Sequence, residues 1–123
     1  MTIRRFEIPV TVDENGDAEV YSPYLSGELV SIHYEKDDFE GEYLAFTLSA
    51  EATGETLWAE EDVIASATRY PRAPTTTTAG AAATFDGTYA VLGKIPLGRD
   101  RVKIVVAGAG DTTSGTFHIT IDG

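Results

Sequence analysis

Apolar residues recur at every second position in several stretches of this chain, and this alternation constrains the fold more than any other feature. A strand points successive side chains to opposite faces, so a period of two marks strands with one buried face. The clearest runs are 6–12, 30–34, 44–48, 102–106 and 117–121. The alternation predicts an all-β fold.

Turn residues lie between these runs. Asn15-Gly16 favours a two-residue hairpin, because both central positions of a type I′ turn need positive φ; it would join strands near 5–13 and 17–22. Thr53-Gly54 would join the 43–50 run to 56–59. The Gly-rich stretch 108–115 separates the last two runs and predicts a hairpin with a long tip.

Pro9 lacks a backbone donor, which predicts an edge strand or a bulge at that position. No segment has convincing helical periodicity, and 58–67 is interpreted as a strand, a short acidic loop and another strand. We therefore expect one domain over residues 1–123, a β-sandwich or jelly-roll-like fold of about eight to ten short antiparallel strands.

Composition limits the partners. The 123 residues carry a formal net charge of −11 and no Cys. Such a surface repels phosphate, so we expect no direct nucleic-acid partner and no anionic membrane partner. No apolar leader or membrane-length run is present, which predicts synthesis as a soluble cytoplasmic chain. The acidity fits either solubility through self-repulsion or adaptation to the high salt of a halophilic host.

Residues 70–83 interrupt the alternation of apolar residues with two prolines and many Thr and Ala. We expect an extended surface loop, longer than a plain connector. It is either a floppy loop or an arm that lies on a neighbouring subunit of a homo-oligomer. The candidate interaction residues are Arg69, Tyr70, Arg72 and Pro74, with the two arginines as anchors for carboxylates of the neighbour.

The search for chemistry assigns no catalytic, cofactor-binding or metal-binding residue. His33 and His118 lie on predicted strands, opposite the apolar face, and are interpreted as surface or inter-subunit side chains. Asp13, Asn15 and Asp17 match the first half of a calcium loop, but Ala18 stands where that motif needs Gly. A weak, non-helical calcium site is the alternative left open. The acidic clusters 37–42 and 60–62 suit solvated turns better than paired catalytic carboxylates.

The run Ala67-Thr68-Arg69-Tyr70-Pro71-Arg72-Ala73-Pro74, with Gly80 a few residues later, carries a resemblance that spans most of the chain from about residue 15. Further matching segments are 20–34, 52–57, 101–106 and 114–117. The chain resembles small proteins encoded among the virion genes of tailed bacteriophages and related archaeal viruses. The resemblance implies a β-rich structural protein of the particle that contacts other virion proteins, namely major capsid, neck or tail subunits.

Three functions remain open at this stage. The first is a non-enzymatic structural protein located in the virion, such as a capsid decoration or turret protein or a neck or tail component. The second is a carbohydrate- or host-surface-binding module that uses Trp58 or exposed Tyr as a stacking platform. The third is an enzyme of unrecognised type, which a deep pocket with converging polar groups would reveal.

Overall fold

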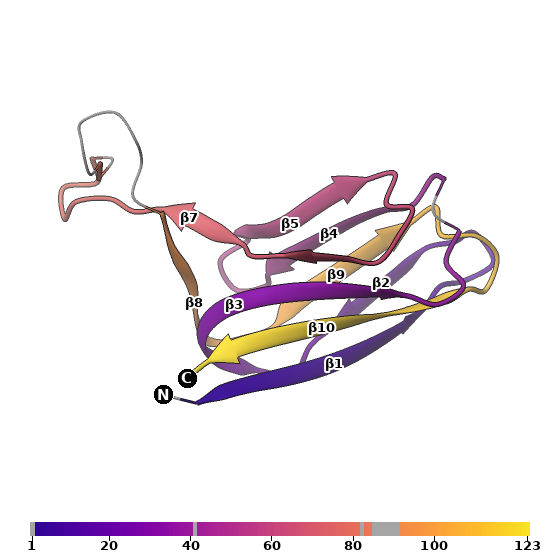
Figure 1. Cartoon of the computed structure of the whole chain (residues 1–123), viewed down its shortest axis with the longest axis horizontal. Coiled ribbons are helices and arrows are strands. Elements are labelled where there is room, and N and C mark those ends of the chain that lie inside the picture. The colour runs from indigo at the N-terminus through magenta and orange to yellow at the C-terminus, as the bar shows by residue number, and fades with distance from the viewer. Residues whose placement is uncertain (1, 41, 82, 85–91) are drawn as a thin grey trace.

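The computed structural model describes residues 2–40, 42–81, 83–84 and 92–123, and over these residues the chain forms two antiparallel sheets with no helix. The sheets pack face to face as a sandwich (Figure 1). The strands are β1 (Ile3–Thr11), β2 (Ala18–Tyr21), β3 (Leu25–Lys36), β4 (Ala45–Ala50), β5 (Thr56–Glu61), β6 (Ala67–Arg69), β7 (Arg72–Pro74), β8 (Leu92–Asp100), β9 (Val102–Ala107) and β10 (Ser114–Asp122). The all-β prediction is confirmed.

The strand order is that of a jelly roll. One sheet runs β1-β10-β3-β8-β7, with β6 also paired to β3, and the other runs β2-β9-β4-β5. Leaving out β6 and β7, the first of eight strands pairs with the eighth, the second with the seventh, the third with the sixth and the fourth with the fifth. These pairs are those of one long hairpin wound into two sheets. Strands β6 and β7 are an insertion between β5 and β8.

Alternation along the strands builds the core. On β10 the side chains of Phe117, Ile119 and Ile121 are fully buried, and on β9 those of Ile104 and Val106 face them from the other sheet. Aromatic rings fill the centre: Phe46 packs edge-on against Phe117, with ring centroids 5.2 Å apart. Burying side chains of this size contributes roughly 1.5–3 kcal/mol each.

The prediction of a hairpin at Asn15-Gly16 is wrong. Strand β1 pairs with β10 in one sheet and β2 with β9 in the other, so the turn carries the chain across the sandwich. The Oδ1 atom of Asp13 accepts the backbone N–H groups of Asn15 and Asp17, which shapes this turn locally. Gly16 has φ 81°, and an added Cβ would lie 2.8 Å from the backbone nitrogen of Ala109, so only glycine fits.

The second hairpin prediction, at 108–115, fails for the same reason. Strand β9 belongs to the four-stranded sheet and β10 to the six-stranded one. The two crossing segments instead bond to each other: Val12 N–H donates to Thr113 O, Thr112 N–H to Asp13 O, and Ala109 N–H to Gly16 O. Turn chemistry identified both bends, but it does not say which strand pairs with which.

Other local predictions are confirmed. Strands β4 and β5 form the hairpin expected at Thr53-Gly54. Segment 58–67 is the end of β5, a short connection and the start of β6. Pro9 lies on β1, the edge strand of its sheet among the described residues, and pairs with Thr116 of β10. The missing N–H of Pro9 therefore interrupts no hydrogen bonding between inner strands.

Tyr34 is an exception within the core. Its ring is fully buried, and the ring centroid lies 5.3 Å from that of Phe46 and 5.4 Å from that of Phe117. Its hydroxyl has no hydrogen-bond partner among the described residues. Burial, with the nearby carboxylate of Asp37, raises the pKa of Tyr34 to about 12.

Replacing Tyr34 with Phe should raise the free energy of unfolding by about 1 kcal/mol at pH 7, because it removes a buried hydroxyl without a partner. The unfolded phenol ionises near pH 10. Since the folded pKa is higher, the unfolded state releases the Tyr34 proton first, so this ionisation lowers the free energy of unfolding as the pH rises from 10 towards 12 and has no effect well below pH 10. The advantage of Tyr34→Phe should therefore grow above pH 10.

Urea denaturation at pH 7, 9 and 10.5 measures both effects. Tyr24→Phe is the matched control, because its ring is exposed, and it should follow the unmodified protein at every pH. A Tyr34→Phe variant less stable than the unmodified protein at pH 7 would contradict this account of the hydroxyl.

Candidate interaction surface

Within the insertion, β6 stays paired with β3, whereas β7 and the start of β8 leave the sandwich as a projecting ribbon, and Arg72 fixes its base. Strand β3 pairs with β8 up to Leu29 and with β6 from Ile32 onward, so the two neighbours part at Val30. The Nη1 atom of Arg72 donates to Val30 O at 3.0 Å and to Pro71 O at 2.8 Å, which fills this fork. Arg72 is thus bonded within its own chain.

Arg69 links the two sheets. It lies on β6, and its Nε and Nη2 atoms donate to the Glu60 carboxylate of β5 at 3.1 and 3.0 Å. Its guanidinium carbon also lies 5.4 Å from the ring centroid of Trp58, and the indole Nε1 donates to the same carboxylate at 3.1 Å. This three-residue group is the Arg69 latch.

Two sequence predictions need correction here. Arg69 and Arg72 do not present free guanidinium groups to a neighbour's carboxylates, because both satisfy groups of their own chain. Trp58 is not an exposed stacking platform: it is 6% exposed, packs edge-on against Phe46 at 4.7 Å between ring centroids, and is covered by Arg69. It pairs with Leu48 of β4, which is also buried, so its side chain points inward.

The ribbon exposes other residues. Strand β7 pairs with the beginning of β8, and Figure 1 shows both leaving the sandwich at one end. Tyr70 is 65% exposed and Leu92 58% exposed, and Pro74 is also exposed. These side chains, with the segment 76–81, form the ribbon surface.

The loop expected over 70–83 is not extended along its whole length. Residues 72–74 form β7, and the chain beyond them folds back on itself. Thr77 N–H donates to Ala81 O, Gly80 N–H to Thr77 O and Ala83 N–H to Thr75 O. A tight turn with local backbone bonds therefore replaces the expected free arm.

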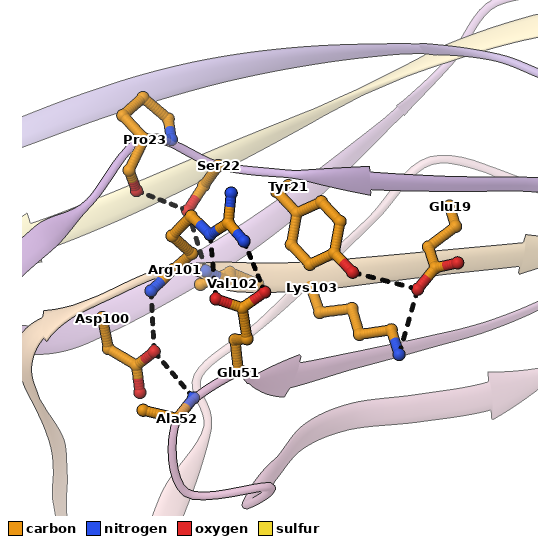
Figure 2. A network of polar contacts seen from close by, with 10 residues as sticks. All are labelled: Glu19, Tyr21, Ser22, Pro23, Glu51, Ala52, Asp100, Arg101, Val102 and Lys103. Carbon is orange, nitrogen blue, oxygen red and sulfur yellow. Dashed lines mark hydrogen bonds and ion pairs between the residues drawn. The ribbon is translucent and has the colours of Figure 1, made fainter.

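A second surface group lies where two crossing segments run side by side (Figure 2). The guanidinium carbon of Arg101 is 4.3 Å from the ring centroid of Tyr21 and 5.3 Å from that of Tyr24. Glu51 holds the same guanidinium through two bonds, from Nε at 2.9 Å and from Nη2 at 2.6 Å. We call Tyr21, Tyr24, Arg101 and Glu51 the tyrosine ledge.

Buried polar groups beneath the ledge fix its backbone. Asp100 is buried and its Oδ1 accepts the N–H groups of Ala52 and Arg101 at 2.9 and 2.8 Å. The Oγ atom of Ser22 accepts the N–H of Val102 at 2.8 Å and donates to Pro23 O (Figure 2). Charge-assisted bonds of this kind hold the two segments in register.

An ion pair continues the ledge along β2 and β9. The ammonium of Lys103 lies 3.0 Å from the Glu19 carboxylate, which also accepts the Tyr21 hydroxyl at 3.1 Å. The bond from Lys103 lowers the pKa of Glu19, and Glu19 in turn raises the pKa of Lys103. The bond to Glu51 raises the pKa of Arg101. Glu19, Lys103 and Arg101 are therefore charged near neutral pH.

Sequence reasoning missed the ledge. The early cluster of tyrosines was visible, but Arg101 is 80 residues from Tyr21 by numbering, and only the pairing of β2 with β9 brings them together. No sequence pattern near Arg101 predicts that its side chain contacts the rings of Tyr21 and Tyr24, which are far away in the sequence.

The two histidines face each other on the outer side of the six-stranded sheet. His33 on β3 pairs directly with His118 on β10, with ring centroids 5.7 Å apart. His33 Nδ1 contacts the Thr68 hydroxyl at 2.6 Å and His118 Nε2 contacts the Glu35 carboxylate at 2.8 Å. Both lie on the face that the alternation assigned to them.

The acidic segments have mainly local roles. Asp13 bonds to backbone groups of its own turn, and Asp38 accepts the N–H and hydroxyl of Ser114. These bonds lower the pKa of Asp38. Within residues 2–40, 42–81, 83–84 and 92–123, no three His, Asp or Glu are grouped to hold a metal ion. The same residues include no helix long and apolar enough to cross a membrane.

Arg69→Gln should lower the free energy of unfolding by about 1 kcal/mol, because the latch joins the sheets but is partly open to water. Glu60→Gln should cost a similar amount, and the double variant should cost less than the sum of the two. Chemical denaturation followed by Trp58 fluorescence measures all three. Arg5→Gln is the control, since Arg5 is exposed and makes no ion pair within the described residues. Equal effects of Arg69→Gln and Arg5→Gln would contradict the latch.

Comparison with known proteins shows a distant structural similarity. No family model and no curated protein matches the chain. A solved structure described as the crystal structure of FLHE is similar over 100% of both chains, with 10% sequence identity and a TM-score of 0.46.

Proposed function

We propose that this chain is a non-enzymatic structural protein of a tailed-virus particle, a capsid decoration or turret protein that acts through protein–protein contacts. The observation that carries the proposal is the ribbon surface, an exposed extension on an otherwise closed jelly roll. The sequence resemblance to virion-encoded proteins supports the same role.

The ribbon is built to reach a neighbour. Its base is held by Arg72, so it extends from a fixed point. It exposes Tyr70 and Leu92, and large exposed side chains of this kind, tyrosine above all, supply much of the binding energy of protein interfaces. In the isolated chain, this extension exposes apolar surface to water, which is unfavourable. Contact with a second protein would bury that surface.

The jelly roll fits this role by analogy of fold. Two-sheet jelly rolls recur in viral capsid domains and in lectin domains. Because one fold hosts many functions, this analogy adds support but does not assign the function.

The charge distribution points to protein partners. Most basic side chains are engaged inside the chain, as Arg69 with Glu60, Lys94 with Asp122, Arg101 with Glu51 and Lys103 with Glu19. The remaining surface is strongly acidic, and the net charge is −11. We therefore propose capsid, neck or tail subunits as partners, with symmetric copies of this chain on the particle, and exclude nucleic acid.

The test is the protein composition of particles purified from cells that produce the virus. Mass spectrometry of gradient-purified particles should detect this chain at a fixed ratio to the major capsid protein. The ratio should persist through a second gradient. Absence of the chain from the particle band, with its presence in the lysate, would overturn the proposal.

Tyr70→Ala should reduce the number of copies on the particle at least about tenfold, because the exposed ring is the largest side chain of the ribbon surface. The melting temperature of the isolated chain should stay unchanged, since the ring is exposed. Tyr43→Ala is the matched control: Tyr43 is 75% exposed but lies outside the ribbon, and its loss should leave occupancy intact. Equal occupancy of both variants would count against the ribbon as the contact surface.

A further inference from the structure

We propose that the tyrosine ledge binds an uncharged pyranose ring of an oligosaccharide, a second site that is independent of the ribbon and of the particle role. The ledge is formed by Tyr21, Tyr24, Arg101 and Glu51. Figure 2 shows Tyr21, Arg101 and Glu51 with Lys103 and Glu19 beside them.

The rings provide the stacking surface. Tyr24 is 61% exposed and Tyr21 39% exposed, although both are apolar enough to favour burial. The C–H face of a sugar ring packs on such a π face, while its hydroxyls remain free for hydrogen bonds at the edge. Tyr43 and Tyr70 are equally exposed, but within the described residues neither has a second ring or an arginine against it.

The ledge is fixed before any ligand arrives. Arg101 lies against both rings, and its guanidinium is held by two bonds to Glu51. The segments that carry these residues are joined by Asp100 and Ser22 beneath them. Ordering a flexible side chain on binding costs free energy, and a site already ordered avoids that cost.

The local charge favours an uncharged ligand. Arg101 and Lys103 are each paired with one carboxylate, Glu51 and Glu19, so the group is neutral within a chain whose net charge is −11. The pairing shifts the pKa values of Glu19, Arg101 and Lys103 away from neutrality, so this balance should hold across the neutral range. An anion would meet the two carboxylates and a cation the two bases.

Hydrogen-bonding groups lie beside the rings. The Glu51 and Glu19 carboxylates are partly exposed and can accept hydroxyl protons, and the Arg101 guanidinium and Lys103 ammonium can donate. The planar carboxylate and guanidinium groups can contact two adjacent hydroxyls at once. Since the ledge is open and not a deep pocket, we expect dissociation constants in the millimolar range.

The experiment is an NMR titration of the isotope-labelled full chain with neutral hexasaccharides of glucose, mannose and N-acetylglucosamine. At least one should give saturable shifts confined to the amides around residues 21–24, 51–52 and 101–103. Hexagalacturonate, an anionic oligosaccharide of similar length, should bind at least about tenfold more weakly.

Variants locate the site. Tyr24→Ala should weaken binding about tenfold, as the loss of one stacking contact predicts, with an unchanged melting temperature because the ring is exposed. Tyr43→Ala is the matched control and should bind like the unmodified protein. Arg101→Lys keeps the charge but loses the planar group against the rings, so it should also weaken binding.

Three results would overturn the proposal: no saturable shift with any neutral hexasaccharide, shifts that survive Tyr24→Ala unchanged, or tighter binding of hexagalacturonate than of the neutral sugars. None of these results bears on the ribbon, because Tyr70 and Leu92 lie outside the ledge.

Discussion

The winding of one long hairpin into two sheets is the constraint on which the rest of this structure depends. Because strands pair first with last, the segments that cross between the sheets also run in pairs and bond to each other. One pair joins residues 12–16 to 109–113, and another joins Ser22 to Val102. The tyrosine ledge sits on the second pair, so its rings and its arginine come from chain segments that only this topology brings together.

The alternation of apolar residues predicted the all-β fold and most of the buried faces correctly. It did not mark β7 or β8, and at Val30 it is wrong: Leu29 is the buried residue there, because the pairing of β3 with β10 shifts register. Its success has a simple cause: which face of a strand is buried is a local property of the sequence, recorded every second residue. The partner of each strand is not local. Asn15-Gly16 and the stretch 108–115 have the composition of hairpin turns, yet both cross the sandwich, because the hydrogen bonds that decide their path come from each other.

The candidate interaction residues show the same contrast between local properties, which the sequence predicts, and contact partners, which it does not. Tyr70 and Pro74 are exposed, as their place in a Pro-rich connection suggested. Arg69, Arg72 and Trp58 were named as interaction candidates, but their contacts in the structure are with Glu60, Val30 and Phe46 of the same chain. An arginine in an acidic chain is an attractive anchor for a neighbour, but its own chain's carboxylates and carbonyls are closer competitors.

The fork in β3 has a consequence for how this chain can change. Strand β10 accompanies β3 along nearly its whole length and fixes its register from one side, whereas β8 and β6 share the other side. Residues inserted or removed within 76–81 therefore leave the wound hairpin intact. The length and tip of the ribbon can diverge freely, while the sandwich that carries it stays the same.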